Sequence, residues 1–181
     1  KPVMWSPVEK TALAEAEVEY HDHKSHTIWV PFRIVAGGAA PMPEGEDDDF
    51  AGADQSILAA DLQGAKVVIW TTTPWTIPSN KAVAYNPGIA YGLYEVTGRP
   101  EECWARIGDR YLIADALAEE VLGKARLEPT MWRRLRGVSA AELSGMVMAH
   151  PLRGVDGADG FWDYDVAMID GYHVSDDAGT G

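Results

Sequence analysis

The sequence predicts a mostly β, α+β domain with a compact, barrel-like architecture. Three observations support this class: many short runs of β-branched and aromatic residues, turns rich in Gly and Pro between them, and only one clear helical segment. The 181 residues fit one domain, which at this length buries about 70% of the surface that the unfolded chain exposes. We therefore expect a single domain over residues 1–181.

The N-terminal part is predicted to hold two strands followed by a loop. Residues 18–23 alternate apolar and polar side chains like an exposed strand, whereas residues 9–17 are rich in Ala and Glu and fit either a helix or a turn. A stronger strand is expected over 27–35, where Pro31 indicates an edge or a bulge. Residues 37–55 are rich in Gly, Ala, Pro and carboxylates, and we predict a mobile acidic loop there. Its carboxylates lack the spacing of a calcium loop.

The centre of the chain begins with an apolar strand that ends at a proline. Residues 67–72 are predicted to form a buried strand, and Pro74 and Pro78 exclude a regular strand or helix between them, so we expect a shaped loop. Short strands separated by Gly- and Pro-containing turns are expected at 82–85, 91–96, 102–107 and 110–113.

The C-terminal part contributes the one clear helix. Residues 115–122 place Leu117, Val121 and Leu122 at helical spacing, and Gly123 follows as a stop signal. Further strands are expected at 132–138, 146–150, 166–169 and 172–174, with a short helical turn at 139–143 and a tight turn at 170–171.

Composition limits the kind of partner. The formal net charge of −13 argues against independent, tight binding to DNA or RNA, because affinity for a phosphate backbone comes mainly from clustered Lys and Arg. No apolar run approaches the roughly 20 residues that span a bilayer, and no signal peptide is recognisable, so we expect no membrane partner. The one cysteine, Cys103, has no Cys or close His neighbour, which predicts a free structural thiol and a cytoplasmic protein.

Common catalytic and cofactor-binding motifs are missing from the sequence. It contains no Gly-x-Ser-x-Gly elbow and no glycine-rich nucleotide-binding loop, so we expect neither a covalent serine mechanism nor a cofactor. His21, His23 and His26 form a weak candidate for a metal site, but a solvated turn explains them better, and no metal is predicted. His173, near Asp177, fits a polar pocket wall and a plain surface hairpin equally well.

Residues 71–80, Thr-Thr-Thr-Pro-Trp-Thr-Ile-Pro-Ser-Asn, form the strongest candidate for a site, and we call them the threonine segment. They concentrate four threonine hydroxyls, one indole and one carboxamide directly after an apolar strand. Such hydroxyls can hydrogen-bond an ester carbonyl, an amine or an attacking water, while the threonine methyl groups limit the size of a bound side chain. Composition alone favours a plainer interpretation, a buried strand and a proline-rich turn, because Thr is common in strands.

The threonine segment resembles the threonine-rich motif of the editing domain, or connective peptide 1, that is inserted into bacterial-type isoleucyl-tRNA synthetases. Residues 12–20 resemble the hinge that leads into this insertion, and residues 176–181 resemble the stretch that leads out of it. Thr73 before Pro74 favours the isoleucine enzymes, because the related valine and leucine enzymes carry Thr-Thr-Arg-Pro there. The resemblance implies one editing domain over residues 1–181, with residues 1–20 as its hinge, and no ATP-dependent activation of amino acids.

The resemblance also implies an activity and a site. The activity is hydrolysis of valine wrongly esterified to tRNA(Ile), and also of valyl-adenylate. One methylene distinguishes valine from isoleucine, and its burial yields only about 1 to 3 kcal/mol of discrimination, so a second pocket must select by size. Carried over by position, the site comprises Thr72, Thr73 and Asn80 as catalytic residues, and Thr71, Trp75 and Thr76 as substrate-binding residues. Trp75 is equally compatible with a role as an anchor in the core.

A noncatalytic fragment is the alternative expectation. In the family, a His-x-Ala-Pro stretch and an acidic residue follow the Ala-Gly-Thr-Gly stretch, and they supply a His and an Asp that hold the substrate amine. This sequence ends at Gly181, and neither His173 nor Asp177 aligns with those residues. Such a fragment would fold and bind amino-acid analogues, or dock on its parent, without turnover. In either case the acceptor end of tRNA(Ile) would be reached mainly through the parent enzyme.

Overall fold

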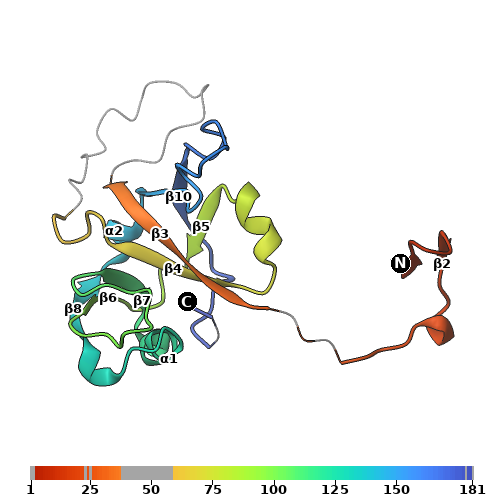
Figure 1. Cartoon of the computed structure of the whole chain (residues 1–181), viewed down its shortest axis with the longest axis horizontal. Helices are drawn as coiled ribbons and strands as arrows, with labels where there is room; N and C mark the ends of the chain where they lie inside the picture. Colours follow the sequence, from red (N-terminus) through yellow and green to blue (C-terminus); the bar gives the residue numbers. More distant parts are fainter. Residues whose placement is uncertain (1–2, 23, 25, 38–58, 178, 181) are drawn as a thin grey trace.

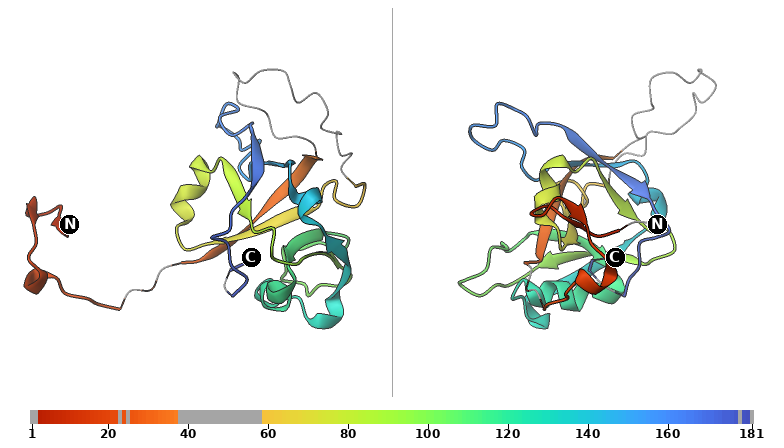
Figure 2. Two further views of the ribbon diagram at one scale, coloured as in Figure 1. Left: turned by 180° about the vertical axis from the view of Figure 1, so that it is seen from behind. Right: turned by 90° about the vertical axis from the view of Figure 1, so that its right-hand side faces the viewer.

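The computed structural model describes residues 3–22, 24, 26–37, 59–177 and 179–180. Within these ranges the chain is mostly β with a few short helices, so the predicted α+β class is confirmed. A small antiparallel sheet pairs β1 (Trp5–Ser6) with β2 (Thr11–Ala12). These strands and the neighbouring N-terminal residues extend away from the rest of the molecule (Figures 1 and 2).

Eight strands form one mixed sheet in the order β5-β10-β9-β3-β4-β7-β6-β8. Their bounds are Ile28–Gly37 (β3), Lys66–Thr71 (β4), Ala82–Tyr85 (β5), Tyr91–Val96 (β6), Arg110–Ala114 (β7), Trp132–Val138 (β8), Met146–Ala149 (β9) and Asp165–Asp170 (β10). Among the described residues no pairing joins the two outer strands, β5 and β8, so the sheet is not closed by hydrogen bonds into a barrel.

The helices are short. The α-helices are α1 (Ala118–Lys124) and α2 (Ala140–Leu143), and the 3-10 helices are η1 (Glu15–Glu17), η2 (Pro74–Ser79), η3 (Asp115–Leu117) and η4 (Pro129–Met131). None of the helices within the described ranges has the length and apolar character needed to cross a membrane.

The long strand β3 connects the two parts of the sheet. Its first half pairs with β4, and its second half pairs with β9 from Ile34 onward, with an irregularity between Ile34 and Ala36. Pro31 lies in the half that has a neighbour on one side, as expected for a residue without a backbone N–H. Figure 1 shows β3 and β4 crossing the centre of the molecule, with β5 and β10 on one side and β6, β7, β8 and α1 on the other.

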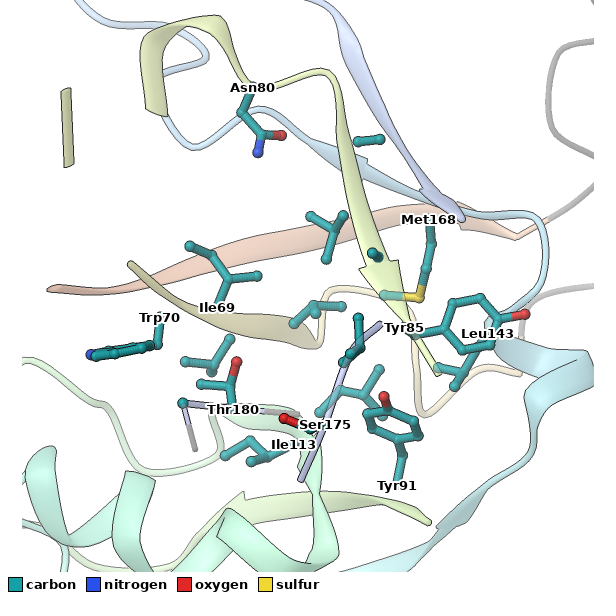
Figure 3. Close-up of a pocket in the computed structure, with 18 residues that line it drawn as sticks. Ile69, Trp70, Asn80, Tyr85, Tyr91, Ile113, Leu143, Met168, Ser175 and Thr180 are labelled. Carbon is teal, nitrogen blue, oxygen red and sulfur yellow. The ribbon is translucent and has the colours of Figure 1, made fainter. Parts of the chain in front are cut away.

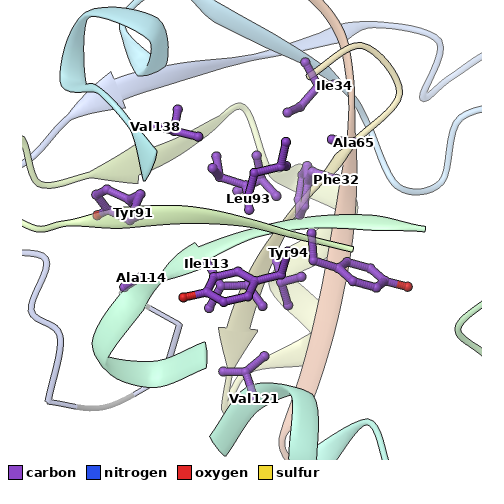
Figure 4. Close-up of a cluster of buried hydrophobic side chains, with 14 of the residues drawn as sticks. Phe32, Ile34, Ala65, Tyr91, Leu93, Tyr94, Ile113, Ala114, Val121 and Val138 are labelled. Atoms are coloured by element: carbon purple, nitrogen blue, oxygen red, sulfur yellow. The ribbon is translucent and has the colours of Figure 1, made fainter. Parts of the chain in front are cut away.

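The described residues form one hydrophobic core where these strands meet. Phe32 of β3, Leu93 of β6 and Ile113 of β7 are almost fully buried and belong to one cluster, together with Val121 of α1 (Figure 4). Burying each such side chain stabilises the fold by about 1.5 to 3 kcal/mol. This core holds β4 and β7 in place, and both strands contribute walls to the site described below.

Most of the predicted strands are confirmed. The bounds of β5, β6 and β8 match the predicted ranges, and β3, β4, β7, β9 and β10 agree to within two residues at each end. The predicted helical turn is also confirmed, with Ser139 capping α2. Apart from Gly37, the predicted acidic loop at 37–55 lies outside the described residues.

Three predicted strands are wrong. Residues 18–22 form none, and His23 lies outside the described residues. Residues 102–107 form turns, because side chains take up backbone groups that a ladder would use: Arg99 donates to the Cys103 carbonyl over 2.7 Å, and Asp109 accepts from the Arg106 N–H over 3.0 Å. Residues 172–174 form a turn as well, since β10 pairs with β5 and β9 instead of folding back on the following residues.

The predicted end of the main helix is also wrong. Gly123 lies inside α1, and the helix ends at Lys124. The left-handed residue after the helix is Arg126, with φ of 63°. The Leu127 N–H donates to the Leu122 carbonyl and the Arg126 N–H to the Gly123 carbonyl, the pair of bonds that closes a Schellman motif.

Candidate functional site

The threonine segment bends sharply after β4, and its own hydroxyls stabilise the bend. The Thr73 N–H donates to Thr71 Oγ1 over 3.0 Å, and the two hydroxyl oxygens lie 3.2 Å apart. The Thr76 hydroxyl donates to the Thr73 carbonyl over 2.8 Å. Three of the four threonines therefore belong to a local hydrogen-bond network that stabilises the turn from β4 into η2.

The predicted shaped loop between the two prolines is wrong, because residues 74–79 form the 3-10 helix η2. Pro74 occupies its first turn, where no backbone donor is needed. The bond from the Thr76 N–H to the Thr73 carbonyl precedes Pro78, and the bond from the Asn80 N–H to the Ile77 carbonyl closes the turn that contains it, both over 3.0 Å. The i to i+3 bonding of a 3-10 helix thus accommodates a proline that would interrupt an α-helix.

The side chains of the segment differ in exposure. Thr72, Thr73, Trp75 and Thr76 are exposed, and Thr71 is half-buried. Trp75 is 72% exposed, so the interpretation of Trp75 as a core anchor is wrong. The indole instead lies on the surface.

A cavity of about 440 Å³ opens beside Asn80 (Figure 3). It lies between β5 and the part of β4 beyond its pairing with β7. Apolar side chains form most of its walls, among them Ile69, Ile113 and Met168. Its polar lining residues are Asn80, Tyr85, Tyr91, Ser175 and Thr180. Apolar walls with a few polar groups are typical of a small-molecule site.

Asn80 links the threonine segment to this cavity. Its backbone is held on both sides, because its N–H donates to Ile77 and its carbonyl accepts from the Tyr164 hydroxyl over 2.9 Å. Its side-chain Oδ1 is buried and, within the described residues, has no hydrogen-bond partner. A buried acceptor without a partner costs about 1 to 3 kcal/mol, so Oδ1 is prepared to accept a hydrogen bond from a ligand or a water.

The described cavity lining contains no Asp, Glu, His, Lys or Arg. Of its two tyrosines, Tyr91 has a pKa raised above 10.0, mainly by burial, so it stays protonated at neutral pH. Its hydroxyl oxygen accepts from the Asn86 N–H over 3.1 Å. The lining can thus orient a polar ligand group or a water, but it supplies no strong base.

The C-terminal residues close one wall of the cavity. The Val174 carbonyl accepts from the Asn86 side chain over 2.8 Å, and the Thr180 carbonyl accepts from the Ala114 N–H over 3.2 Å. Gly179 adopts a φ of +78°, and a Cβ on it would lie 3.1 Å from Cε3 of Trp70. This glycine therefore lets the chain pass close to the indole of Trp70 on β4.

The structure brings only part of the predicted site into the cavity lining. Asn80 lines the cavity, whereas Thr71, Thr72, Thr73, Trp75 and Thr76 lie along the adjoining segment. Sequence reasoning missed Trp70 and Tyr91 and the C-terminal wall of Val174, Ser175, Gly179 and Thr180. It also missed His150, Trp162 and Tyr164, whose side chains bind η2 and Asn80. The dense aromatic run at 161–164 could have indicated Trp162 and Tyr164.

The remaining candidates lie elsewhere. His173 is exposed on a turn and does not line the cavity, so neither the pocket wall nor the hairpin describes it, and Asp177 is exposed as well. Cys103 is a buried free thiol whose Sγ donates to the Ala125 carbonyl over 3.2 Å, as predicted for a structural cysteine. His23 lies outside the described residues, and the rest of the described chain holds no group of three metal-binding side chains.

Comparison with known proteins identifies relatives of the whole chain. No family model matches it. The isoleucine–tRNA ligases of Ruegeria pomeroyi, Caulobacter vibrioides and Mesorhizobium japonicum are 53%, 50% and 48% identical to it over 181, 185 and 181 residues. Each match covers 100% of this chain but only 16%, 16% and 18% of the relative. The chain is thus related along its whole length to a segment of the isoleucine–tRNA ligases.

Proposed function

We propose that this chain is an editing domain of the connective peptide 1 type, which hydrolyses valine wrongly esterified to tRNA(Ile). The observation that carries the proposal is the buried, unpartnered Oδ1 of Asn80 at the junction of the threonine segment and an apolar cavity. The relation to isoleucine–tRNA ligases supports the substrate class. Valyl-adenylate, which also carries an activated valine, is the second proposed substrate.

The proposed chemistry is attack of a positioned water on the ester. The water oxygen bonds to the carbonyl carbon, and the bond from that carbon to the ribose oxygen breaks, which releases valine and tRNA with a free ribose hydroxyl. Because the described lining supplies no strong base, we assign catalysis to orientation of the water and polarisation of the carbonyl. Thr72, Thr73 and Asn80 are the proposed groups for these tasks.

Substrate selection is proposed to rest on the size of the site. Thr71, Trp75 and Thr76 would contact the aminoacyl end of the substrate, and the methyl groups of the threonines would limit the bound side chain. A second site that accepts valine and excludes isoleucine supplies discrimination that a single binding step cannot give for one methylene.

The tRNA is proposed to bind mainly through the rest of a longer ligase. Three arginines on β8 are a candidate for phosphate contacts, but each pairs with a carboxylate: Arg133 with Glu95, Arg134 with Asp115, and Arg136 with Asp61 and Glu142. Those pairs and the net charge of −13 oppose independent binding of RNA. We further propose that residues 1–20 act as the hinge to that ligase, and that the reaction takes place in the cytoplasm.

The test is deacylation of Val-tRNA(Ile) by the isoleucine–tRNA ligase that contains this segment. We expect Asn80→Ala and Thr72→Ala to lower the rate about 100-fold, as removal of one positioned polar group does in other hydrolytic sites. Thr130→Ala, at an exposed threonine of η4, is the matched control and should leave the rate unchanged. Unchanged deacylation in both site variants would refute the assignment.

The noncatalytic alternative gives a different result. A ligase in which this segment only binds would retain affinity for a valyl-adenosine analogue and show no hydrolysis of Val-tRNA(Ile). Measuring the 181-residue chain beside the longer ligase separates a domain that needs further residues from one that never hydrolyses the ester.

A further inference from the structure

We propose that His150, Trp162 and Tyr164 are positioning residues for Asn80 in the editing reaction. The inference rests on the function proposed above, because it names the groups that hold the proposed site in place. We call these three side chains the aromatic anchor. They lie 73 to 84 residues after the carbonyls that they bind, and none of them lines the cavity.

The aromatic anchor binds the end of η2 and the residue that follows it through three side-chain donors. Nε2 of His150 lies 3.0 Å from the Ile77 carbonyl oxygen, and the Trp162 Nε1–H donates to the Pro78 carbonyl over 2.9 Å. The Tyr164 hydroxyl donates to the carbonyl of Asn80 itself over 2.9 Å. Three of the four carbonyls from residue 77 to residue 80 are thus fixed by groups from another part of the chain.

The hydrogen bonds of His150 define which ring nitrogen carries the proton. The Leu152 N–H donates to Nδ1 over 3.2 Å, so Nδ1 is an acceptor and has no hydrogen. The hydrogen of the neutral ring is therefore on Nε2, which donates to Ile77. One imidazole thus connects the start of the 150–164 loop to η2.

The anchor packs against the core through His150. His150 is only 1% exposed, and its ring stacks on that of Trp162 with an angle of 6° between the planes. The Tyr164 ring centroid lies 4.9 Å from that of His150, and Phe32 of the core packs edge-on against the imidazole. The position of η2 is therefore set by the core of the sheet through the anchor.

The 3-10 helix needs this external support. It contains two prolines, so two of its residues have no N–H to donate, and its short i to i+3 bonds hold it only weakly. The side chain of Asn80 has no described hydrogen bond of its own at Oδ1. The direction of the Asn80 carboxamide therefore depends on the Asn80 backbone, and the anchor holds that backbone in place.

Conservative variants separate the hydrogen bonds from the packing. Trp162→Phe and Tyr164→Phe each remove one donor and keep a ring. His150→Gln keeps a donor near the place of Nε2, whereas the shorter His150→Asn places its carboxamide near Nδ1 and leaves no donor near Nε2. Tyr94→Phe is the matched control, because it removes a 2.6 Å hydrogen bond from a buried tyrosine to Asp115 in another part of the sheet.

The first measurement is hydrogen exchange of the Asn80 and Thr76 amides in the 181-residue chain, which needs no substrate. We expect Trp162→Phe and Tyr164→Phe to speed local exchange about 3- to 10-fold, the effect of one lost hydrogen bond, and Tyr94→Phe to leave it unchanged. These two amides should exchange more slowly in His150→Gln than in His150→Asn. Equal exchange in all five variants and the unaltered chain would overturn the inference.

The second measurement is deacylation of Val-tRNA(Ile) by the longer ligase carrying the same variants. A positioning role predicts that kcat falls about 10-fold in Tyr164→Phe with KM nearly unchanged, since misplacing a reacting group weakens only the transition state. Faster exchange with an unchanged kcat would overturn the positioning role while the proposed function stands. If the unaltered ligase does not hydrolyse Val-tRNA(Ile), the proposed function fails, and the exchange data still show whether the anchor holds η2.

Discussion

The two parts of the sheet differ in whether their polar side chains have partners. Around β6, β7 and β8, several described carboxylates are bound by basic side chains, as in the pairs Asp115–Arg134 and Lys66–Asp109. Around β4, η2 and β5, the cavity has no charged lining residue among those described, and the buried Oδ1 of Asn80 has no partner. We call these the paired half and the cavity half. The first uses its polar groups for stability, whereas the second leaves one available for a ligand.

The largest expected effect on stability is in the paired half, at Gly92 of β6. A Cβ at this position would lie 2.8 Å from Cε2 of Tyr94 and 3.0 Å from Nε of Arg134. Gly92→Ala should therefore displace the Asp115–Arg134 pair and lower the free energy of unfolding by about 3 kcal/mol. Urea denaturation measures this, with Gly123→Ala in α1 as the control, since nothing lies within 4 Å of a Cβ there. An equal stability of both variants would contradict the close packing of the paired half.

The next largest effect is expected at Arg136 on β8. Its guanidinium donates to both carboxylate oxygens of Asp61, at 2.6 and 3.0 Å, and to Glu142 at 2.7 Å. Arg136→Met leaves two partly buried carboxylates without this donor, so we expect a loss of about 2 kcal/mol in thermal or urea unfolding. Arg106→Met, at an exposed arginine, is the matched control and should change stability little. A loss of equal size in the control would mean that the network around Arg136 adds nothing.

A smaller effect is expected in the cavity half, at Gly179. Its φ of +78° and its contact with Trp70 make a side chain unfavourable there. Gly179→Ala should cost about 1 kcal/mol, and the loss should be local to the C-terminal wall. Hydrogen exchange of the Ala114 amide, which donates to Thr180, reports on this wall directly. If that amide exchanges at the same rate in both proteins, the wall does not depend on Gly179.

The smallest and most gradual effect is a loss of stability in acid. The hydrogen bond from Arg136 lowers the pKa of Asp61 below 3.8, and the hydrogen bond from Arg134 does the same for Asp115. Because these folded-state pKa values are depressed, the stability they confer is complete above about pH 4 and is lost as the pH falls through the folded-state values. Unfolding free energies measured from pH 2 to 7 should fall in this range, and Arg134→Met should flatten the decrease. A decrease unaltered by that substitution would exclude the Asp115 pair as a cause.

The sequence predicts the strands better than the segments between them. The bounds of β5, β6 and β8 follow from local signals, because Gly- and Pro-containing turns interrupt short runs of strand-forming residues. Local signals fail at 102–107, where the side chains of Arg99 and Asp109 bind the backbone, and at 74–79, where a 3-10 helix accommodates Pro78. No local pattern contains information about such partners.

The candidate site shows the same difference between local signals, which the sequence reveals, and distant contacts, which it does not. The threonine segment stands out in the sequence by its density of hydroxyls, and the resemblance to editing domains assigns it a role. The cavity, in contrast, combines β4, β5, β7 and the C-terminal residues, and its support comes from Tyr164 across 84 residues of sequence. Such groups meet only through the pairing order of the sheet, which periodicity does not reveal.

The pairing of β5 with β10 has a consequence for how the molecule forms. Ala82 is in register with Ala167, so the strand that follows the threonine segment obtains its partner only after most of the chain is in place. A parallel pairing of such high sequence separation closes a long loop and is intrinsically slow to form. During synthesis, β3 and β4 can pair early, whereas the cavity wall that contains β5 cannot form until β10 has left the ribosome. The proposed site around Asn80 and β5 should therefore be the last part of this chain to fold.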